Sequence, residues 1–379
     1  MPFARVNPGD LIQAQNLDQL VDSFNGVSGK GIPVAETSVN DTTNYALSVQ
    51  NLDPTNSRAL NVLKNDGSLL IRADANGVNL GAPLTVPNAS ITNAELGPDV
   101  ARSNLLVNPG FEWWQRGPGA FMTNGVYAAD RWSLFNSGGM SVSKDSTNQD
   151  TGSGSCLAAS ITAVVAGSTQ VQQKVEDYLN LRGRTVSLSI RVRTSTANAV
   201  HIGMYDGAYT YGAYHTGDGT YQTLTFTRTL ATGITSLYVV VDFQQNCTAY
   251  LDNACLVVGS QPANYVPLHP ADDLARCQRY YEVRSDAYMA SGYNYSATQA
   301  EFVHKYAVHK GGTPTATISA AAGFAVRALG ANIACSALGG NIPGLDSALV
   351  QFTVASGLTA GQGSILNSGG GSIAMEWNP

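Results

Sequence analysis

The chain has 379 residues, which is more than one ordinary domain holds, so we expect two or three folded units. Charged residues make up 13% of the chain, about half of the ~25% usual in globular proteins, and 39 residues are glycine. This composition is typical of short strands joined by tight turns. The net charge of −6 provides no basic field, so we do not expect a nucleic-acid-binding protein.

Neither a membrane span nor a secretory leader is expected. No window approaches the ~18 apolar residues that cross a bilayer, and MPFARVNPGD lacks the basic start and apolar run of a signal peptide. The cysteines are widely spaced and form no CxxC pair, which predicts free buried thiols rather than disulfides or a zinc site. They are Cys156, Cys247, Cys255, Cys277 and Cys335. The chain is therefore expected to fold in a reducing cytosol.

The N-terminal segment 1–39 contains one helical pattern. Apolar residues at Leu17, Leu20, Val21 and Phe24 follow the spacing i, i+3, i+4 and i+7, which predicts a short helix over 10–24. A helix of this length is marginal alone in water. We expect this segment to pack on copies of itself or on another protein.

Residues 40–86 carry short alternating patterns such as Tyr45, Leu47 and Val49, separated by turn signals such as NDG at 65–67. Each predicted strand offers only two or three apolar side chains, too few for a monomeric core. Three chains that pool these side chains around one axis would close a core, so a trimeric β stalk is predicted. Residues 87–103 are predicted to be a linker.

The segment 104–268 has stronger alternation. TVSLSIRVR at 185–193 predicts a half-buried strand with a polar outer face. The pattern at 200–205 places His201 and Tyr205 on the face opposite the apolar residues. Six to eight such strands separated by turns fit a jelly-roll β-sandwich.

The segment 269–379 begins with DDLARCQRYYE, which predicts a helix over 272–282, and continues with tyrosine-rich strands and a glycine-rich tail. We expect a small C-terminal β tip domain. The predicted fold class is mainly β: a short N-terminal helix and trimeric β stalk, a central jelly-roll β-sandwich and this tip.

Two sets of motifs resemble known families. NLLVNPGFEWW and ADRW within 104–132, with AYLDNACLVVG at 249–259, resemble the opening and closing strands of carbohydrate-binding modules of the calcium-containing jelly-roll type. Phage tail proteins also use such modules. LARCQRYYEV at 274–283, placed directly after the module and before a β domain, resembles the distal half of phage tail-fibre proteins. The resemblance implies a phage tail fibre or receptor-binding protein.

The first resemblance also implies a structural calcium ion. In calcium-bearing jelly rolls a cation ties the first strand to the last, and the matching carboxylates here belong to Glu112 and Asp252. Calcium takes about six to eight oxygens, so backbone carbonyls or water would complete the shell. The alternative is that both carboxylates cap turns or accept hydrogen bonds from backbone amides.

Sugar binding needs flat aromatic faces beside polar groups, and two tyrosine clusters offer them. MYDGAYTYGAYHTGDG is predicted to be an exposed loop with Asp206, His215 and Asp218 as polar partners. Its tyrosines are Tyr205, Tyr209, Tyr211 and Tyr214. The second cluster, in the tip, is Tyr288, Tyr293 and Tyr295. The alternative for the first cluster is a subunit contact, and Trp113 and Trp132 are predicted to be core residues.

No GxSxG, HExxH, P-loop or GxGxxG pattern is present, so an enzyme is not expected. The predicted protein is a virion tail-fibre homotrimer, assembled in the host cytoplasm, that adheres to a host-surface glycan and contacts other virion proteins through its N-terminal region. One alternative is a purely structural virion protein, such as a head decoration or fibre connector. Another is a secreted or cell-surface bacterial glycan-binding protein, which the missing leader and the unpaired cysteines disfavour.

Overall fold

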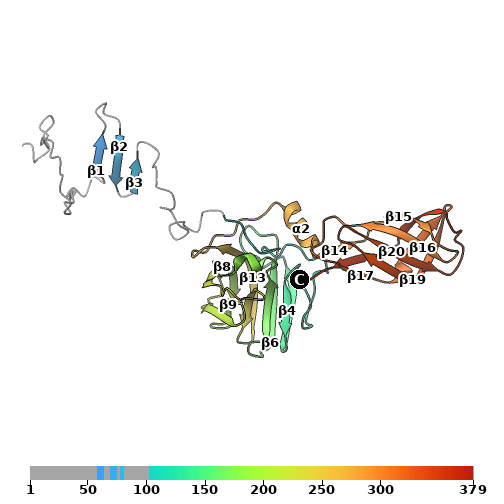
Figure 1. Ribbon diagram of the computed structural model, residues 1–379. Coiled ribbons are helices and arrows are strands. Elements are labelled where there is room, and N and C mark those ends of the chain that lie inside the picture. The colour runs from blue at the N-terminus through green and yellow to red at the C-terminus, as the bar shows by residue number, and fades with distance from the viewer. Residues whose placement is uncertain (1–57, 64–68, 75–76, 81–101, 379) are drawn as a thin grey trace, which may run out of the picture. The chain divides into compact units, whose positions relative to one another are not determined.

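The computed structural model describes residues 102–378 fully, and residues 58–63, 69–74 and 77–80 by their backbone (Figure 1). The chain forms two compact units, Met1–Val86 and Pro87–Pro379. The described residues are mainly β. The helix predicted over 10–24 and most of the predicted linker lie outside the described residues. Within the described part of the chain, no helix is long and apolar enough to cross a membrane.

The described part of the first unit is a three-stranded antiparallel sheet. Its strands are β1 (Arg58–Leu63), β2 (Leu69–Asp74) and β3 (Gly77–Leu80), in the order β1-β2-β3. They fall in the segment for which the sequence predicts strands. The trimeric stalk stays a prediction.

Two antiparallel five-stranded sheets begin the second unit. One has the order β10-β9-β12-β7-β4 and consists of β4 (Ser133–Asn136), β7 (Thr169–Lys174), β9 (Val200–Tyr205), β10 (Tyr209–Tyr214) and β12 (Tyr238–Phe243). The other has the order β11-β8-β13-β6-β5 and consists of β5 (Gly139–Asp145), β6 (Cys156–Ala163), β8 (Thr185–Thr194), β11 (Tyr221–Thr229) and β13 (Cys247–Val258). A 3₁₀ turn, η1 (Tyr178–Leu181), lies between β7 and β8.

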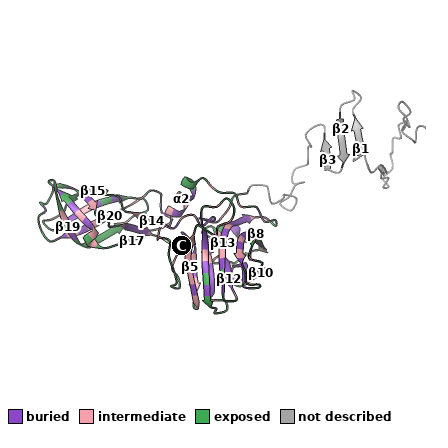
Figure 2. Cartoon of the chain, turned by 180° about the vertical axis from the view of Figure 1, so that it is seen from behind, coloured by how far each residue is buried: buried purple, intermediate pink, exposed green. Residues whose placement is uncertain are grey.

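Apolar side chains of both sheets form one core between them, so the two sheets make a β-sandwich (Figure 2). Leu188 of β8 and Ile202 of β9 are fully buried in this core, as the alternation predicts. Trp132 is also fully buried, and its indole N–H donates to the carbonyl of Asn108 at 3.0 Å. The indole therefore satisfies its one polar group while filling the core.

The C-terminal part of the second unit holds a helix, a small sheet and a closed barrel. The helix is α2 (Pro270–Gln278), and the sheet β14-β22-β17 consists of β14 (Tyr281–Arg284), β17 (Thr315–Ile318) and β22 (Ile373–Glu376). The barrel has the order β15-β16-β20-β19-β18-β21. Its strands are β15 (Tyr288–Asn294), β16 (Gln299–Lys305), β18 (Phe324–Ala328), β19 (Ala331–Pro343), β20 (Ser347–Val354) and β21 (Gly363–Ser368), with the 3₁₀ turn η2 (Ala321–Gly323) before β18.

The helix predicted over 272–282 is shorter than expected. His269 caps its start by accepting the N–H of Ala271, and the helix ends at Gln278. Tyr281 instead begins β14 and pairs with Glu376 of β22. The last residues of the predicted helix therefore belong to this sheet instead. All five cysteines are buried free thiols, as predicted.

The RYY segment, Arg279–Tyr281, joins the sandwich to the C-terminal part through cation–π stacks. The guanidinium of Arg116 lies 3.7 Å from the ring centre of Tyr281 and pairs with Glu376 at 2.8 Å. The guanidinium of Arg131 lies 3.9 Å from the ring centre of Tyr280. Such contacts are worth up to ~2 kcal/mol each when they are desolvated. Both arginines belong to the sandwich, so this segment contacts it directly.

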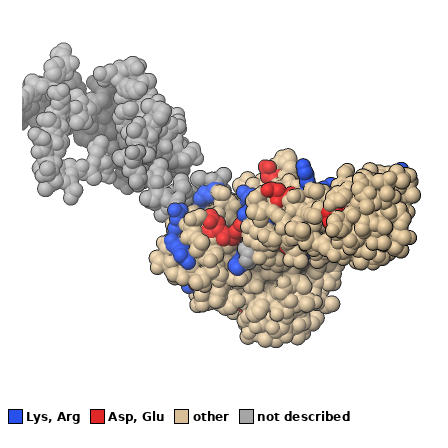
Figure 3. Space-filling view, turned by 45° about the vertical axis from the view of Figure 1, so that its right-hand side comes forward, with Lys and Arg blue, Asp and Glu red and all other residues tan. Residues whose placement is uncertain are grey.

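Charged side chains are sparse on the surface that Figure 3 shows, where they gather in a few groups among uncharged residues. One charged pair is buried in the C-terminal part. Lys310 is fully buried, and its ammonium donates to Glu282 at 3.1 Å and to the carbonyl of Gln278. Glu282 also accepts the N–H of Ala307. Burial lowers the pKa of Lys310.

Replacement of Lys310 by methionine leaves the Glu282 carboxylate buried without its cation. We expect Lys310→Met to lower the free energy of unfolding by about 3–5 kcal/mol, the usual cost of breaking a buried ion pair. Chemical denaturation of the full chain measures this change. The control is Lys305→Met, because Lys305 is exposed on β16. Equal stability of the two variants would contradict the assigned role of the pair.

Candidate functional site

A row of side chains crosses one end of the sheet β10-β9-β12-β7-β4 on its outer face. Strand register places Tyr209 beside Tyr205, Tyr205 beside Tyr238, and Tyr238 beside Lys174. The ring centre of Tyr205 lies 4.8 Å from that of Tyr209 and 5.9 Å from that of Tyr238. The ammonium of Lys174 lies 5.9 Å from the Tyr238 ring centre. Because β9 turns Met204 into the core, the neighbouring Tyr205 faces outward.

Two further tyrosines stack on His201 beside this row. The His201 ring centre lies 4.2 Å from that of Tyr211 and 4.3 Å from that of Tyr214, and all three rings are nearly parallel. Gly203 makes room for this arrangement, because a Cβ there would come within 2.6 Å of the Tyr211 ring. The ring of Tyr211 is also parallel to that of Tyr209, at 6.1 Å. We call these five tyrosines, with His201, the aromatic face.

Hydrogen-bonding groups lie among the rings. Asp242 is fully buried and accepts from Gln170 Nε2 at 2.9 Å and pairs with His201 Nε2 at 2.8 Å. Gln170 also donates to the hydroxyl of Tyr211 at 3.0 Å. Burial raises the pKa of Tyr211, so its hydroxyl is neutral at physiological pH. Gln170 and Asp242 are fully buried, so they hold the rings in place, and the flat faces of exposed rings suit the C–H faces of a sugar.

Four tyrosines of the aromatic face, Tyr205, Tyr209, Tyr211 and Tyr214, come from the first predicted cluster. The prediction of an exposed loop is wrong for Tyr209, Tyr211 and Tyr214, which belong to strand β10, whereas Tyr205 lies on β9, as the alternation at 200–205 predicts. Their uneven spacing arises from the turn at 206–208 and from a register irregularity between Tyr211 and Tyr214. Tyr209 and Tyr214 are 39% and 40% exposed, so a ligand can reach them.

The predicted polar partners of this cluster have structural roles instead. Asp206 is buried and pairs with Arg228 at 2.6 Å. His215 is fully buried with its ring against backbone carbonyls, and Asp218 accepts hydrogen bonds within its own turn. Gln170 and Asp242, both fully buried, were missed, whereas the alternation at 200–205 placed His201 on the outer face without assigning it to the cluster. Only the pairing of β7, β9 and β12 brings these three residues together.

The two predicted metal ligands bind backbone amides in this structure. Glu112 accepts the N–H groups of Gly154 and Ser155 and lies 3.2 Å from the Ser155 hydroxyl. Asp252 is fully buried and accepts the N–H groups of Asp150 and Asn253. Among the described residues no group of three or more His, Cys, Asp or Glu side chains is placed to hold a metal. Both carboxylates accept hydrogen bonds from backbone amides, as the alternative expects, and calcium binding stays a prediction.

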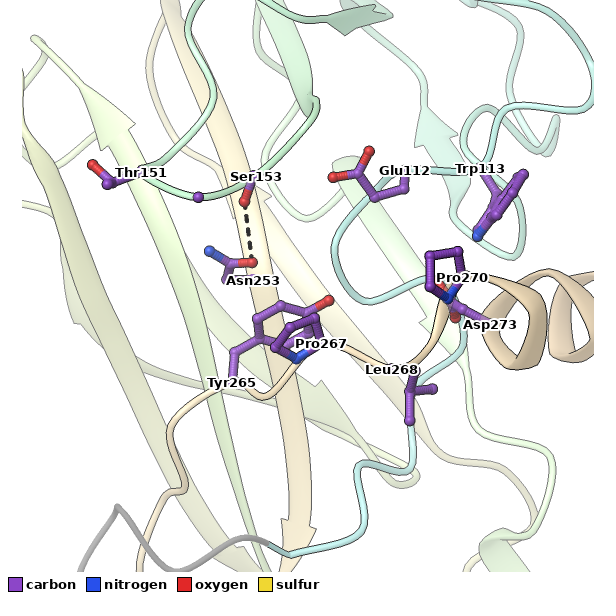
Figure 4. Close-up of a pocket in the computed structure, with 11 residues that line it drawn as sticks. Glu112, Trp113, Thr151, Ser153, Asn253, Tyr265, Pro267, Leu268, Pro270 and Asp273 are labelled. Atoms are coloured by element: carbon purple, nitrogen blue, oxygen red, sulfur yellow. Dashed lines mark hydrogen bonds between the residues drawn. The ribbon is translucent and has the colours of Figure 1, made fainter.

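A pocket of about 550 Å³ opens beside Glu112 (Figure 4). Glu112 and Trp113 enter it from the loop before β4, while Pro270 and Asp273 enter it from the start of α2. The remaining wall includes Tyr265 and the hydrogen-bonded pair of Ser153 and Asn253. Trp113 is partly buried and lines this pocket, so its prediction as a core residue is wrong, while that of Trp132 is confirmed.

The tyrosines of the second predicted cluster, Tyr288, Tyr293 and Tyr295, are exposed but do not form one patch. Tyr288 begins β15 beside Asn367, whereas Tyr293 lies near its other end beside Glu301. Five residues of strand separate them by about 16 Å. The Tyr293 hydroxyl donates to Glu301 at 2.7 Å, and Tyr295 follows in the next turn. Tyr293 and Tyr295 remain a pair on the barrel.

Comparisons with known proteins concern structure only. No family model matches the chain, and no curated protein matches its sequence. The xylan-binding domain CBM22-1 of Paenibacillus barcinonensis is similar over 43% of this chain and 98% of its own, with 15% identity and a TM-score of 0.30. A family 22 carbohydrate-binding module of Clostridium thermocellum covers 38% of this chain and 99% of its own, with 18% identity and a TM-score of 0.30. The enzymatically active domain of bacteriophage CBA120 tailspike protein 4 covers 41% of this chain and 21% of its own, with 14% identity and a TM-score of 0.29.

The buried carboxyl of Asp252 predicts a pH dependence of stability. Burial raises its pKa to about 7, whereas an unfolded aspartate titrates near about 3.9. Between these values the folded chain binds more protons than the unfolded chain, so this group makes stability fall as pH rises from about 4 to 7. Urea unfolding at a series of pH values should show a smaller fall for Asp252→Asn. The exposed Asp272→Asn is the control, and an identical pH dependence in all three proteins would contradict the assignment.

Titration with calcium tests whether Glu112 and Asp252 bind a calcium ion or only accept hydrogen bonds from backbone amides. Chelator-treated protein that binds calcium should give heat in calorimetry and a higher melting temperature, and Glu112→Gln should remove both effects. Neither signal should arise if Glu112 and Asp252 bind only backbone amides.

Proposed function

We propose that this chain is a virion fibre protein that adheres to a host-surface glycan through the aromatic face. The observation that carries the proposal is the row of Tyr209, Tyr205 and Tyr238 across three neighbouring strands, with hydrogen-bonding groups at its side. Strands lie about 4.8 Å apart, so the three rings span about 10 Å and accept an extended ligand rather than a single small one.

The rigidity of the face supports this role. Its rings stack on one another, and the buried Asp242 holds His201 and Gln170 in place, so little side-chain freedom is lost on binding. The edge strand β10 leaves Tyr209 and Tyr214 open to solvent. The carboxylate of Asp242 is fully buried and accepts hydrogen bonds from neighbouring side chains, so it is not free to act on a ligand. The arrangement therefore suits binding without catalysis.

We further propose that three chains form the fibre, that the assembly takes place in the host cytoplasm, and that the N-terminal region contacts other virion proteins. Exposed apolar side chains that adjoin one another on the barrel support self-association: Ile342 of β19, 70% exposed, and Val303 of β16, 50% exposed, are both register partners of Leu349 of β20. Three sites on one fibre would turn weak single contacts into firm attachment by raising the effective concentration.

The same exposed apolar residues also favour a second candidate function. In a purely structural virion protein, such as a head decoration or fibre connector, the aromatic face and the barrel surface would be subunit contacts. The two functions differ in whether the aromatic face is open to solvent in the assembled particle.

Replacement of two rings tests the adhesion proposal. We expect Tyr209→Ala combined with Tyr211→Ala to weaken binding to host cells and to glycans on an array by roughly tenfold or more, because two stacking contacts are lost. The control is Tyr250→Ala, a half-buried tyrosine of β13 in the other sheet. Unchanged binding of the double variant, with an unchanged melting temperature, would favour the structural function.

Light scattering of the purified chain tests assembly. We expect a mass three times that of one chain, independent of protein concentration in the micromolar range. A stable monomer would contradict the trimeric fibre. Binding of labelled trimer to intact host cells then tests function separately from assembly.

A further inference from the structure

A second cavity, of about 300 Å³, opens where the end of β7 meets helix α2. Four of the residues that line it carry a cationic side chain: Arg131, Lys174, Arg276 and Arg279. Two are acidic, Glu176 and Asp177, which leaves a formal excess of two positive charges. In a chain with a net charge of −6 and sparse charged residues, this local excess is unusual. We call this cavity the arginine pocket.

Arg131 is the most constrained cation of the arginine pocket. Its side chain is 3% exposed and stacks on the ring of Tyr280, and Nη2 donates to the carbonyl of Lys174 at 2.6 Å. Nε and Nη1 are buried and have no acceptor among the described residues. Buried donors without an acceptor are costly, and an oxygen of a carboxylate or phosphate is a strong acceptor for either of these two N–H groups.

The other charges of the arginine pocket do not cancel its excess. Glu176 is already engaged by Arg279 at 2.7 Å and by the hydroxyl of Tyr280. Asp177 is exposed at the start of the η1 turn. Arg276 makes one long contact, 3.4 Å from Nη1 to the carbonyl of Asn104. Arg131 and Arg276 therefore keep donors for a ligand.

The arginine pocket is continuous with the aromatic face. The row of Tyr209, Tyr205 and Tyr238 ends at Lys174, which also lines the pocket. Lys174 is joined to Arg131 through its backbone carbonyl. A chain-like ligand that lies along the rings would thus reach the arginine pocket at the end of the row.

We infer that the glycan is anionic and that the arginine pocket binds an oxyanion group that it carries. A carboxylate of an acidic sugar and a phosphate in a polysaccharide share this chemistry. The cavity volume is at the lower end of that of small-molecule sites and fits a compact group. The inference rests on the proposed function for the nature of the ligand, whereas anion binding itself rests on the pocket alone.

Calorimetry with the full-length protein tests the inference. The probes are polygalacturonate, its carboxyl-reduced neutral form, and galacturonate, inorganic phosphate and glucose as competitors. We expect polygalacturonate to bind about tenfold more tightly than the reduced polymer and its binding to weaken in high salt. Arg276→Met combined with Lys174→Met should remove this preference. The control is Arg193→Met, because Arg193 lies on the other sheet over Tyr250.

The competitors identify the oxyanion. Competition by galacturonate and not by phosphate or glucose assigns a carboxylate, and competition by phosphate assigns a phosphate-bearing polymer. The inference is overturned if no anion competes, or if the double variant binds every probe as the wild type does while it remains folded by its melting temperature.

The failure of the two proposals can be told apart. If Tyr209→Ala with Tyr211→Ala leaves cell binding unchanged while anion binding still needs Arg276, the adhesion proposal fails and the arginine pocket stands. If the tyrosine variant loses glycan binding while the arginine variant keeps it, the adhesion proposal stands and the anionic ligand is excluded.

Discussion

The packing of two five-stranded sheets on one core determines which side chains reach the aromatic face. Strand β9 turns Met204 inward, so Tyr205 points outward, and β12 turns Val241 inward, so Asp242 points outward. A slip of one residue would bury the tyrosines and expose the apolar side chains, so the register is strongly specified. Burial of the sandwich core therefore also determines which side chains form the aromatic face.

The RYY segment connects the sandwich to the C-terminal part of the second unit. Tyr280 stacks on Arg131, and its hydroxyl donates to Glu176, which in turn pairs with Arg279. These four residues also line the arginine pocket. The same contacts that join the sandwich to the C-terminal part therefore form the cavity. The RYY segment therefore has a physical reason to follow the sandwich closely in the chain, because its side chains complete a surface that the sandwich begins.

Charged residues are sparse in this chain, and several of its ionisable groups are buried, where they affect stability strongly. The Lys310–Glu282 pair, the carboxyl of Asp252 and the guanidinium of Arg131 are all buried, where the loss of water makes each unmatched charge costly. Two of these groups have their partners within the chain. Arg131 retains two buried nitrogens without an acceptor among the described residues, and the proposal of an anionic ligand rests in part on them.

The sequence by itself determined the mainly β class, the strand faces of the sandwich and the burial of the cysteines, because period-two alternation and local turn residues are properties of short segments. It also singled out four tyrosines of the aromatic face. Only the tertiary structure decided that Tyr209, Tyr211 and Tyr214 lie on a strand, that Tyr238 and Asp242 lie beside Tyr205 and His201, and that the predicted helix ends at Gln278 in favour of β14. Pairing between strands far apart in the sequence places these groups together, and no local pattern encodes which strands become neighbours.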